Sequence, residues 1–120
     1  MTKNDLPAVR RLANNKAIHY TGHALNQMLQ RGITTDDIEE VLCSNTNQLV
    51  EVQSKSNTPG KQHRNDRFLI YDPQHIQDII LVCVIINMPL PAISIITAEY
   101  PDPQKWVKTP GGDPAIVRIK

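Results

Sequence analysis

The sequence predicts a single α+β domain in which N-terminal helices pack on a curled antiparallel sheet of about four to five strands. Apolar residues recur with helical spacing up to about residue 43, and they alternate with a period of two from about residue 48 onward. The length of 120 residues suits one domain and is too short for two independent cores. We expect a helical part over residues 4–43, a sheet over 48–100 and a Pro/Gly-rich tail over 101–120.

Charge and hydropathy exclude several classes of protein. The chain carries 13 basic and 12 acidic side chains, so no global field draws it onto nucleic acid, and any phosphate site must be a local patch. The N-terminal segment lacks the apolar stretch of a signal peptide, and the longest apolar run, residues 79–86, is far shorter than the roughly 20 residues of a membrane helix. We therefore expect a soluble protein that works inside the cell.

The two cysteines give no indication of catalytic chemistry. Cys43 ends an amphipathic segment and Cys83 lies in an apolar run, without C-x-x-C spacing, which favours reduced thiols and leaves a single bridge open. The sequence also contains no Gly-rich phosphate loop and no G-x-S-x-G motif.

Helices are expected before residue 44. Residues 4–15 show irregular helical spacing, whereas Thr21 and Gly32 supply the cap and the left-handed stop of a clearer second helix. The apolar face of that second helix consists of Ala24, Leu25, Met28 and Leu29. Thr34 and Asp37 form a capping-box pattern for a third helix, which runs to about Cys43. We interpret its acidic side chains as a solvated face and not as a metal site; they are Asp36, Asp37, Glu39 and Glu40.

Strands follow. Residues 48–53 and 67–71 alternate in hydropathy around a turn at 54–61, and the apolar run 78–86 is typical of a central strand covered on both faces. Prolines at 89 and 91 break pairing before another strand at 93–100. In the tail, residues 115–119 fit a short edge strand.

Residues 22–34 carry a motif that is similar to a known family. Their sequence, GHALNQMLQRGIT, is followed by Asp37, Ile38, Val41 and Leu42. This segment resembles a bacterial family of unknown function numbered 4258, whose usual form is H-A-x-x-R-M-x-x-R-G-I followed by an acidic helix. Gln27 stands where that form has arginine, and residues 95–100 are a looser match to the family's closing strand.

That family resembles the RelE and BrnT ribonuclease toxins and the toxin domains of contact-dependent inhibition systems, which share a layout of helices followed by an antiparallel sheet. The resemblance implies cleavage of tRNA or mRNA without metal or cofactor, in which a base takes the ribose 2′-hydroxyl proton and that oxygen attacks phosphorus. The products would be a 2′,3′-cyclic phosphate and a 5′-hydroxyl. It also implies a cognate antitoxin or immunity protein as partner, and action in the cytoplasm, including after delivery as the C-terminal part of a larger secreted protein.

Such a site needs a group that titrates near neutrality and cations where negative charge develops. We assign His23 as general acid or base, and Arg31 as a phosphate ligand or as the residue that holds the end of its helix. Arg67 faces the open sheet surface, opposite to Phe68.

The closing strand and two basic segments complete the expected site. Thr97, on the face of Ile93 and Ile95, would orient a phosphate, and Tyr100 would stack a base or donate a proton; strict alternation separates the two unless a bulge intervenes. The expected RNA-binding residues are Lys61, His63, Arg64 and Trp106. For Trp106 the alternative, which we favour, is that it pins the tail to the core.

Other functions remain open on the same fold. The near-neutral charge and Gln27 fit a non-catalytic protein-binding module. A toxin-neutralising partner is a further alternative, since the acidic helix could mimic RNA phosphates. His19 and His23 have the spacing of a zinc pair, but the cap at Thr21 falls between them and no third ligand is evident, so we expect no metal.

Overall fold

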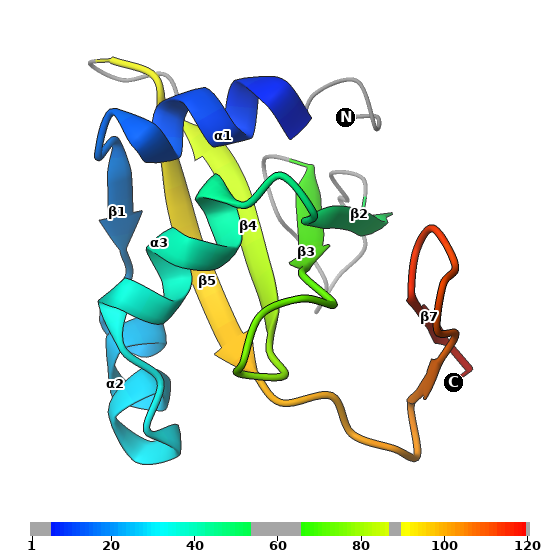
Figure 1. Ribbon diagram of the computed structural model, residues 1–120. Helices are drawn as coiled ribbons and strands as arrows, with labels where there is room; N and C mark the ends of the chain where they lie inside the picture. The colour runs from blue at the N-terminus through cyan, green and yellow to red at the C-terminus, as the bar shows by residue number, and fades with distance from the viewer. Residues whose placement is uncertain (1–5, 54–65, 87–89, 120) are drawn as a thin grey trace.

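A computed structural model describes residues 6–53, 66–86 and 90–119 and has the expected α+β architecture (Figure 1). The N-terminal part consists of α1 (Leu6–Asn14), β1 (Ile18–Tyr20), α2 (Gly22–Arg31) and α3 (Thr35–Cys43). The sheet then continues with β2 (Gln48–Gln53), β3 (Arg67–Tyr71), β4 (Ile80–Ile86) and β5 (Ala92–Glu99), and the chain ends with β6 (Trp106–Lys108) and β7 (Ile116–Arg118). Among the described helices, none has the length and apolar character needed to cross a bilayer.

The main sheet has the strand order β1-β5-β4-β3-β2. The buried strand β4 is central, as the apolar run predicted, and β2 to β5 pair antiparallel. The predicted antiparallel layout is confirmed for these four strands, and β1 adds a fifth strand that pairs parallel with β5. Residues 115–119 do contain a strand, but β7 pairs with β6 in a separate hairpin and adds no edge to the main sheet.

The predicted caps of α2 and α3 are confirmed. The Oγ1 atom of Thr21 accepts a hydrogen bond from the backbone N–H of Ala24, and Gly32 ends α2 with a φ of 68°. Thr34 and Asp37 form both bonds of a capping box. The two caps start α2 and α3 where the sequence placed them, and the turn at Gly32 sets the angle between the two helices.

The apolar face of α2 is narrower than its sequence suggested. Ala24 and Met28 are buried against β5. Leu25 and Leu29, which we expected on the same face, are 46% and 82% exposed. They lie about 100° further around the helix, and no other helix covers that flank in the described part of the chain.

Each face of the sheet has its own hydrophobic cluster. The helices cover the first face, and in Figure 1 α1 and α3 cross the strands there. The hairpin β6–β7 covers the second face through Trp106 and Ile116, which pack with Leu69, Tyr71 and Ile80. Trp106 is only 6% exposed, so the prediction that it pins the tail to the core is confirmed.

An irregularity in β5 changes which side chains share a face. Cys83 pairs with Ile95, but Val82 pairs with Thr97, so Ile96 is an extra residue on β5. Paired residues lie on the same face of a sheet, and Val82 belongs to the second cluster. Thr97 therefore lies on the hairpin face, and the expectation that it shares a face with Ile95 was wrong.

The hairpin is also tied to the sheet by an ion pair whose strength depends on pH. The Nε and Nη2 atoms of Arg118 each donate to the Glu51 carboxylate at 2.9 Å. This pairing with Arg118 holds the pKa of Glu51 below its ordinary value of 4.5. A lowered pKa means that the unfolded chain binds the proton more tightly, so the contribution to stability is present above pH 4.5 and is lost as pH falls through the lower, folded pKa.

We therefore expect Glu51→Gln to lower the stability at pH 7 and to lower it by less at pH 3, relative to the wild type at the same pH. Urea denaturation followed by circular dichroism at the two pH values measures this difference. An equal loss at both values would contradict a contribution from the ionised pair, because Gln keeps the size of the side chain and removes only its charge.

Candidate functional site

His23 lies at the start of α2, directly after the parallel strand β1. It is exposed, and it makes no hydrogen bond or ion pair in the part of the chain that the structure describes. Gln27 and Arg31 follow at intervals of four residues, so the three side chains lie on one side of the helix in successive turns. The Oε1 atom of Gln27 is buried without a hydrogen-bond partner among the described residues.

Arg31 and Tyr100 meet at the opposite end of α2. The Nη1 atom of Arg31 donates to the carbonyl oxygen of Ala98 at 2.8 Å, and the Tyr100 hydroxyl donates to the carbonyl oxygen of Arg31 at 3.0 Å. The same hydroxyl lies 3.2 Å from the Oε1 atom of Gln77. Of the two roles weighed for Arg31, this geometry fits the one that holds the end of the helix, about 12 Å along the axis from His23.

The remaining predicted residues do not join His23. Tyr20, the last residue of β1, lies in the same row of the sheet as Phe68 on β3. Tyr20 pairs with Ile95, Ile95 pairs with Cys83 on β4, and Cys83 pairs with Phe68. Three strand spacings, about 14 Å, thus separate the two strands. Arg67 also lies on the opposite face from Phe68 and the helices, together with Thr97.

The expected RNA-binding residues are placed only in part. Trp106 is buried under the hairpin, where the Arg118 guanidinium lies 4.4 Å from its ring centroid, so the ring has no free face for a base. Lys61, His63 and Arg64, like the turn at 54–61, lie outside the described residues.

Most described cations of the molecule have intramolecular partners. Lys16 pairs with Glu39, and Lys108 pairs with Asp78. Arg118 pairs with Glu51, as described above. These ion pairs neutralise three of the described cations, whereas Arg10 and Arg31 donate only to neutral oxygens, and Arg11, Arg67 and Lys105 have no partner among the described residues.

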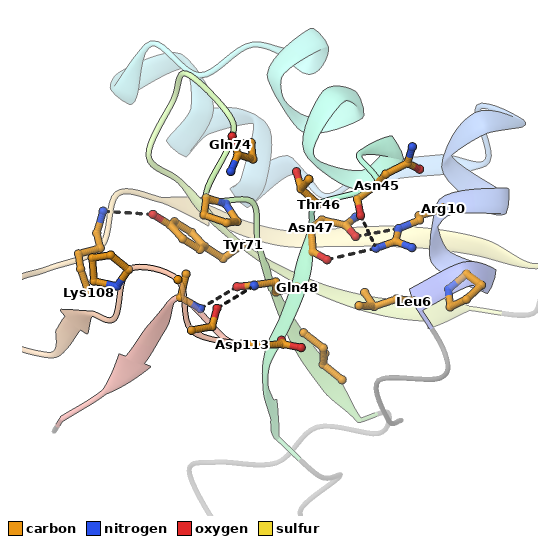
Figure 2. A pocket seen from close by; sticks show the side chains of 17 residues that line it. Leu6, Arg10, Asn45, Thr46, Asn47, Gln48, Tyr71, Gln74, Lys108 and Asp113 are labelled. Carbon is orange, nitrogen blue, oxygen red and sulfur yellow. Dashed lines mark hydrogen bonds between the residues drawn. The ribbon is translucent and has the colours of Figure 1, made fainter.

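The chain also has a pocket of about 890 Å³ that the sequence did not predict (Figure 2). It lies between the start of α1, the segment after α3 and the loop of the C-terminal hairpin. Its lining is mainly amide, proline and glycine residues, with two cations; among them are Asn45, Asn47, Gln48, Gln74, Pro73, Pro110, Gly111, Gly112, Arg10 and Lys108. Because these residues come from four distant segments, no local motif could have indicated the pocket.

Asn47 fixes one wall of this pocket. The side chain is buried, and its Nδ2 atom donates to the carbonyl oxygens of Val41 and Leu42 at the end of α3. Its Oδ1 atom accepts from the Nε atom of Arg10 at 2.9 Å. Figure 2 shows Arg10 turned toward this segment, where it also donates to the carbonyl oxygen of Asn45. Arg10 therefore serves the packing of α1 on the end of α3.

A second group of polar side chains joins α3 to the connection between β3 and β4. The Nε2 atom of His75 lies 2.7 Å from the Oε2 atom of Glu40 and 3.9 Å from the Oδ1 atom of Asp37. Burial lowers the pKa of His75, but the hydrogen bonds to Glu40 and to the Gln77 backbone outweigh it and leave the pKa raised. Sequence reasoning missed His75, although the Asp37-x-x-Glu40 spacing on a helix was a signal that two carboxylates share a face.

Comparison with known proteins gives one match. The model of the family described as a domain of unknown function (DUF4258) matches residues 20–109. No curated protein and no solved structure matches the chain. The matched range includes only the last residue of β1, but it contains all of α2 and α3 and the strands β2 to β6, and therefore most of the fold as well as His23 and the motif after it. The chain thus belongs to the DUF4258 family.

Proposed function

We propose that this protein is a toxin-type endoribonuclease that acts in the cytoplasm, with His23 as its general acid or base, and that a cognate antitoxin or immunity protein neutralises it. The observation that carries the proposal is the state of His23, an exposed imidazole with no structural contact in the described chain. A histidine that holds the fold together would have a partner, as His75 does.

The start of α2 also offers a place for the phosphate beside that imidazole. The Oγ1 atom of Thr21 accepts a hydrogen bond from the N–H group of Ala24, and its carbonyl oxygen accepts one from the N–H group of Leu25. The N–H groups of Gly22 and His23 therefore remain available to a ligand. A Cβ atom built on Gly22 would meet nothing within 4 Å, so this end of the helix is open to a bulky anion. A scissile phosphate at this helix end would place the neighbouring ribose within reach of His23.

The chemistry then needs no metal. His23 takes the proton of the 2′-hydroxyl, the freed oxygen attacks phosphorus as the bond to the 5′-oxygen breaks, and the leaving oxygen takes a proton from solvent water, so that a 2′,3′-cyclic phosphate and a 5′-hydroxyl are formed. His23 then returns its proton to the solvent. The helix N–H groups stabilise the charge that develops on the phosphoryl oxygens. Arg31 and Tyr100 position the far end of α2 through the Ala98 carbonyl and each other, and they do not contact the phosphate.

The test is RNA cleavage by the purified chain in chelator, with fragment ends analysed for the cyclic phosphate. General acid–base catalysis contributes about 10²- to 10⁴-fold, so His23→Ala should lower the cleavage rate by about 100-fold or more. The matched control is His19→Ala, which removes another exposed histidine four residues away, on β1, and should cleave like the wild type.

Equal cleavage by the wild type and His23→Ala would contradict the proposal, because it would assign the activity to another site or to a contaminant. The assay is repeated with translating ribosomes, since a toxin of this kind can require ribosome-bound message. Higher salt should weaken cleavage if phosphate contacts hold the substrate.

A non-catalytic protein-binding module is the second candidate. It is favoured by Leu25 and Leu29, two exposed apolar side chains one turn apart on α2, and by the internal pairing of Lys16, Lys108 and Arg118. Absence of cleavage with both free RNA and ribosomes would favour this candidate over the enzyme.

A toxin-neutralising role has less support. It would need free carboxylates on α3 as phosphate mimics, but Asp37 and Glu40 face His75, and Glu39 pairs with Lys16.

A further inference from the structure

Three potential metal ligands converge where α3 meets the β3–β4 connection. Asp37 and Glu40 project from α3, and His75 reaches them from the connection. One ligand atom of each residue lies within 4.8 Å of the other two. This site is separate from His23, which belongs to the opposite end of α2.

We propose that Asp37, Glu40 and His75 bind one divalent transition-metal ion, with Zn²⁺ as the ion that fits best. One imidazole nitrogen and two carboxylates form a donor set that suits zinc, whereas magnesium and calcium prefer oxygen ligands alone. Three protein ligands leave a fourth tetrahedral position for water, and Glu40, which is 62% exposed, lies at the solvent side of the site.

The spacing of the ligand atoms is close to what zinc requires. Ligands about 2.0–2.1 Å from a tetrahedral ion are about 3.3 Å apart. The observed separations from the Nε2 atom of His75 are 2.7 Å to Glu40 and 3.9 Å to Asp37, one shorter and one longer than that value. A small side-chain rotation of Glu40, the most exposed of the three, would lengthen the first separation, and a small rotation of the His75 ring would shorten the second, without moving the backbone.

The ligands are already oriented by their second contacts. The Oδ2 atom of Asp37 accepts from the N–H of Thr34 at 2.9 Å in the capping box, which leaves Oδ1 directed at His75. The Nδ1 atom of His75 lies 3.0 Å from the backbone N–H of Gln77 and 3.2 Å from its carbonyl oxygen.

The contact between the Nδ1 atom of His75 and the carbonyl oxygen of Gln77 is the one that a metal-bound histidine needs. When Nε2 binds an ion, Nδ1 carries the proton and donates it, most often to a carbonyl oxygen or a carboxylate. Gln77 provides this acceptor, and it provides a donor for the other tautomer. The ring can therefore exchange a proton on Nε2 for a metal ion while Nδ1 stays hydrogen-bonded.

Metal binding would fix the β3–β4 connection to α3. The effect would extend to Gln77, whose Oε1 atom lies 3.2 Å from the Tyr100 hydroxyl, and so to the end of α2 at Arg31. The role is structural, and it does not require the proposed ribonuclease activity, since that activity is assayed in chelator.

The experiment is calorimetric titration of the metal-free full chain with Zn²⁺ at neutral pH, with Co²⁺ as a spectroscopic substitute. We expect one equivalent to bind, a visible Co²⁺ absorption typical of tetrahedral coordination, and a higher melting temperature with Zn²⁺. Loss of a second-shell contact alone costs 10- to 100-fold in affinity, so His75→Ala and Glu40→Gln should each weaken binding by about tenfold or more.

Two controls make the result specific. Asp36→Asn removes one negative charge from α3, as Glu40→Gln does, but at an exposed position outside the cluster. His23→Ala removes the histidine that could bind an ion together with His19. Both should bind like the wild type. Glu40→Gln alters an exposed side chain, so it keeps the test valid if His75→Ala does not fold.

Either of two results would overturn the proposal. One is the absence of saturable Zn²⁺ binding by the wild type. The other is binding that survives in Glu40→Gln and is lost in His23→Ala, which would place the ion on the His19–His23 pair.

Discussion

Replacing Trp106 by alanine is expected to destabilise the protein by about 3–5 kcal/mol, the usual cost of removing a large buried aromatic side chain. Trp106 is 6% exposed and lies at the centre of the cluster between the sheet and the hairpin, with Leu69, Tyr71 and Ile116. Its removal also leaves the Arg118 guanidinium without the ring that lies 4.4 Å away. The second face of the sheet would lose most of its cover.

Urea denaturation followed by far-ultraviolet circular dichroism measures the change, because the variant has no tryptophan fluorescence. Val107→Ala is the matched control, since Val107 is the next residue of β6 but is 44% exposed and should cost less than about 1 kcal/mol. Equal losses in the two variants would contradict the assignment of Trp106 as the residue that pins the tail. An unchanged stability with weakened RNA binding would instead support base stacking.

Replacing Asn47 by alanine is expected to cost about 2–4 kcal/mol, because one side chain satisfies three buried or partly buried groups. The variant leaves the carbonyl oxygens of Val41 and Leu42 without its Nδ2 donor, and Arg10 without its 2.9 Å acceptor. The end of α3 and its packing on α1 would both weaken.

Asn45→Ala is the control for this prediction. Asn45 is exposed and offers Arg10 only its backbone carbonyl oxygen, which alanine keeps. Its stability should stay within about 0.5 kcal/mol of the wild type. A comparable loss in both variants would show that the loop conformation, and not the Asn47 side chain, supports α1.

The sequence predicted those parts of the fold that local chemistry determines. Thr21, Gly32 and the Thr34–Asp37 pair act within one helical turn, so their roles can be recognised without knowledge of the fold. The run of apolar residues identified β4 as central because only a strand covered on both faces has so few polar positions.

The features that the sequence did not predict depend on contacts between distant segments. β1 has three residues, too few to show a period, and its partner β5 lies more than seventy residues later. The extra residue Ile96 changes the face of Thr97, and nothing in the alternation of β5 marks it. Leu25 and Leu29 fit a helical apolar face, but no second helix lies against that flank in the described chain.

The residues of the candidate site likewise differ in how far the local sequence could identify them. His23 could be identified because a contiguous motif surrounds it, and the structure adds that it is exposed and uncommitted. The role of Arg31 depends on its hydrogen bond to the carbonyl oxygen of Ala98. The role of His75 depends on its contact with Glu40, which forms where the β3–β4 connection packs against α3. These are tertiary contacts, so residue types and spacing alone could not distinguish a phosphate ligand from a structural arginine.

The parallel pairing of β1 with β5 has a consequence for how the protein is made. Ile18 pairs with Ile93, so β1 and the start of α2 cannot take their final places until the ribosome has synthesised β5. The contact is highly non-local, and such contacts form late in folding. A nascent chain would therefore carry the His23 motif for most of its synthesis without the framework that positions it, and the start of α2 would reach its final surroundings only after β5 has been translated.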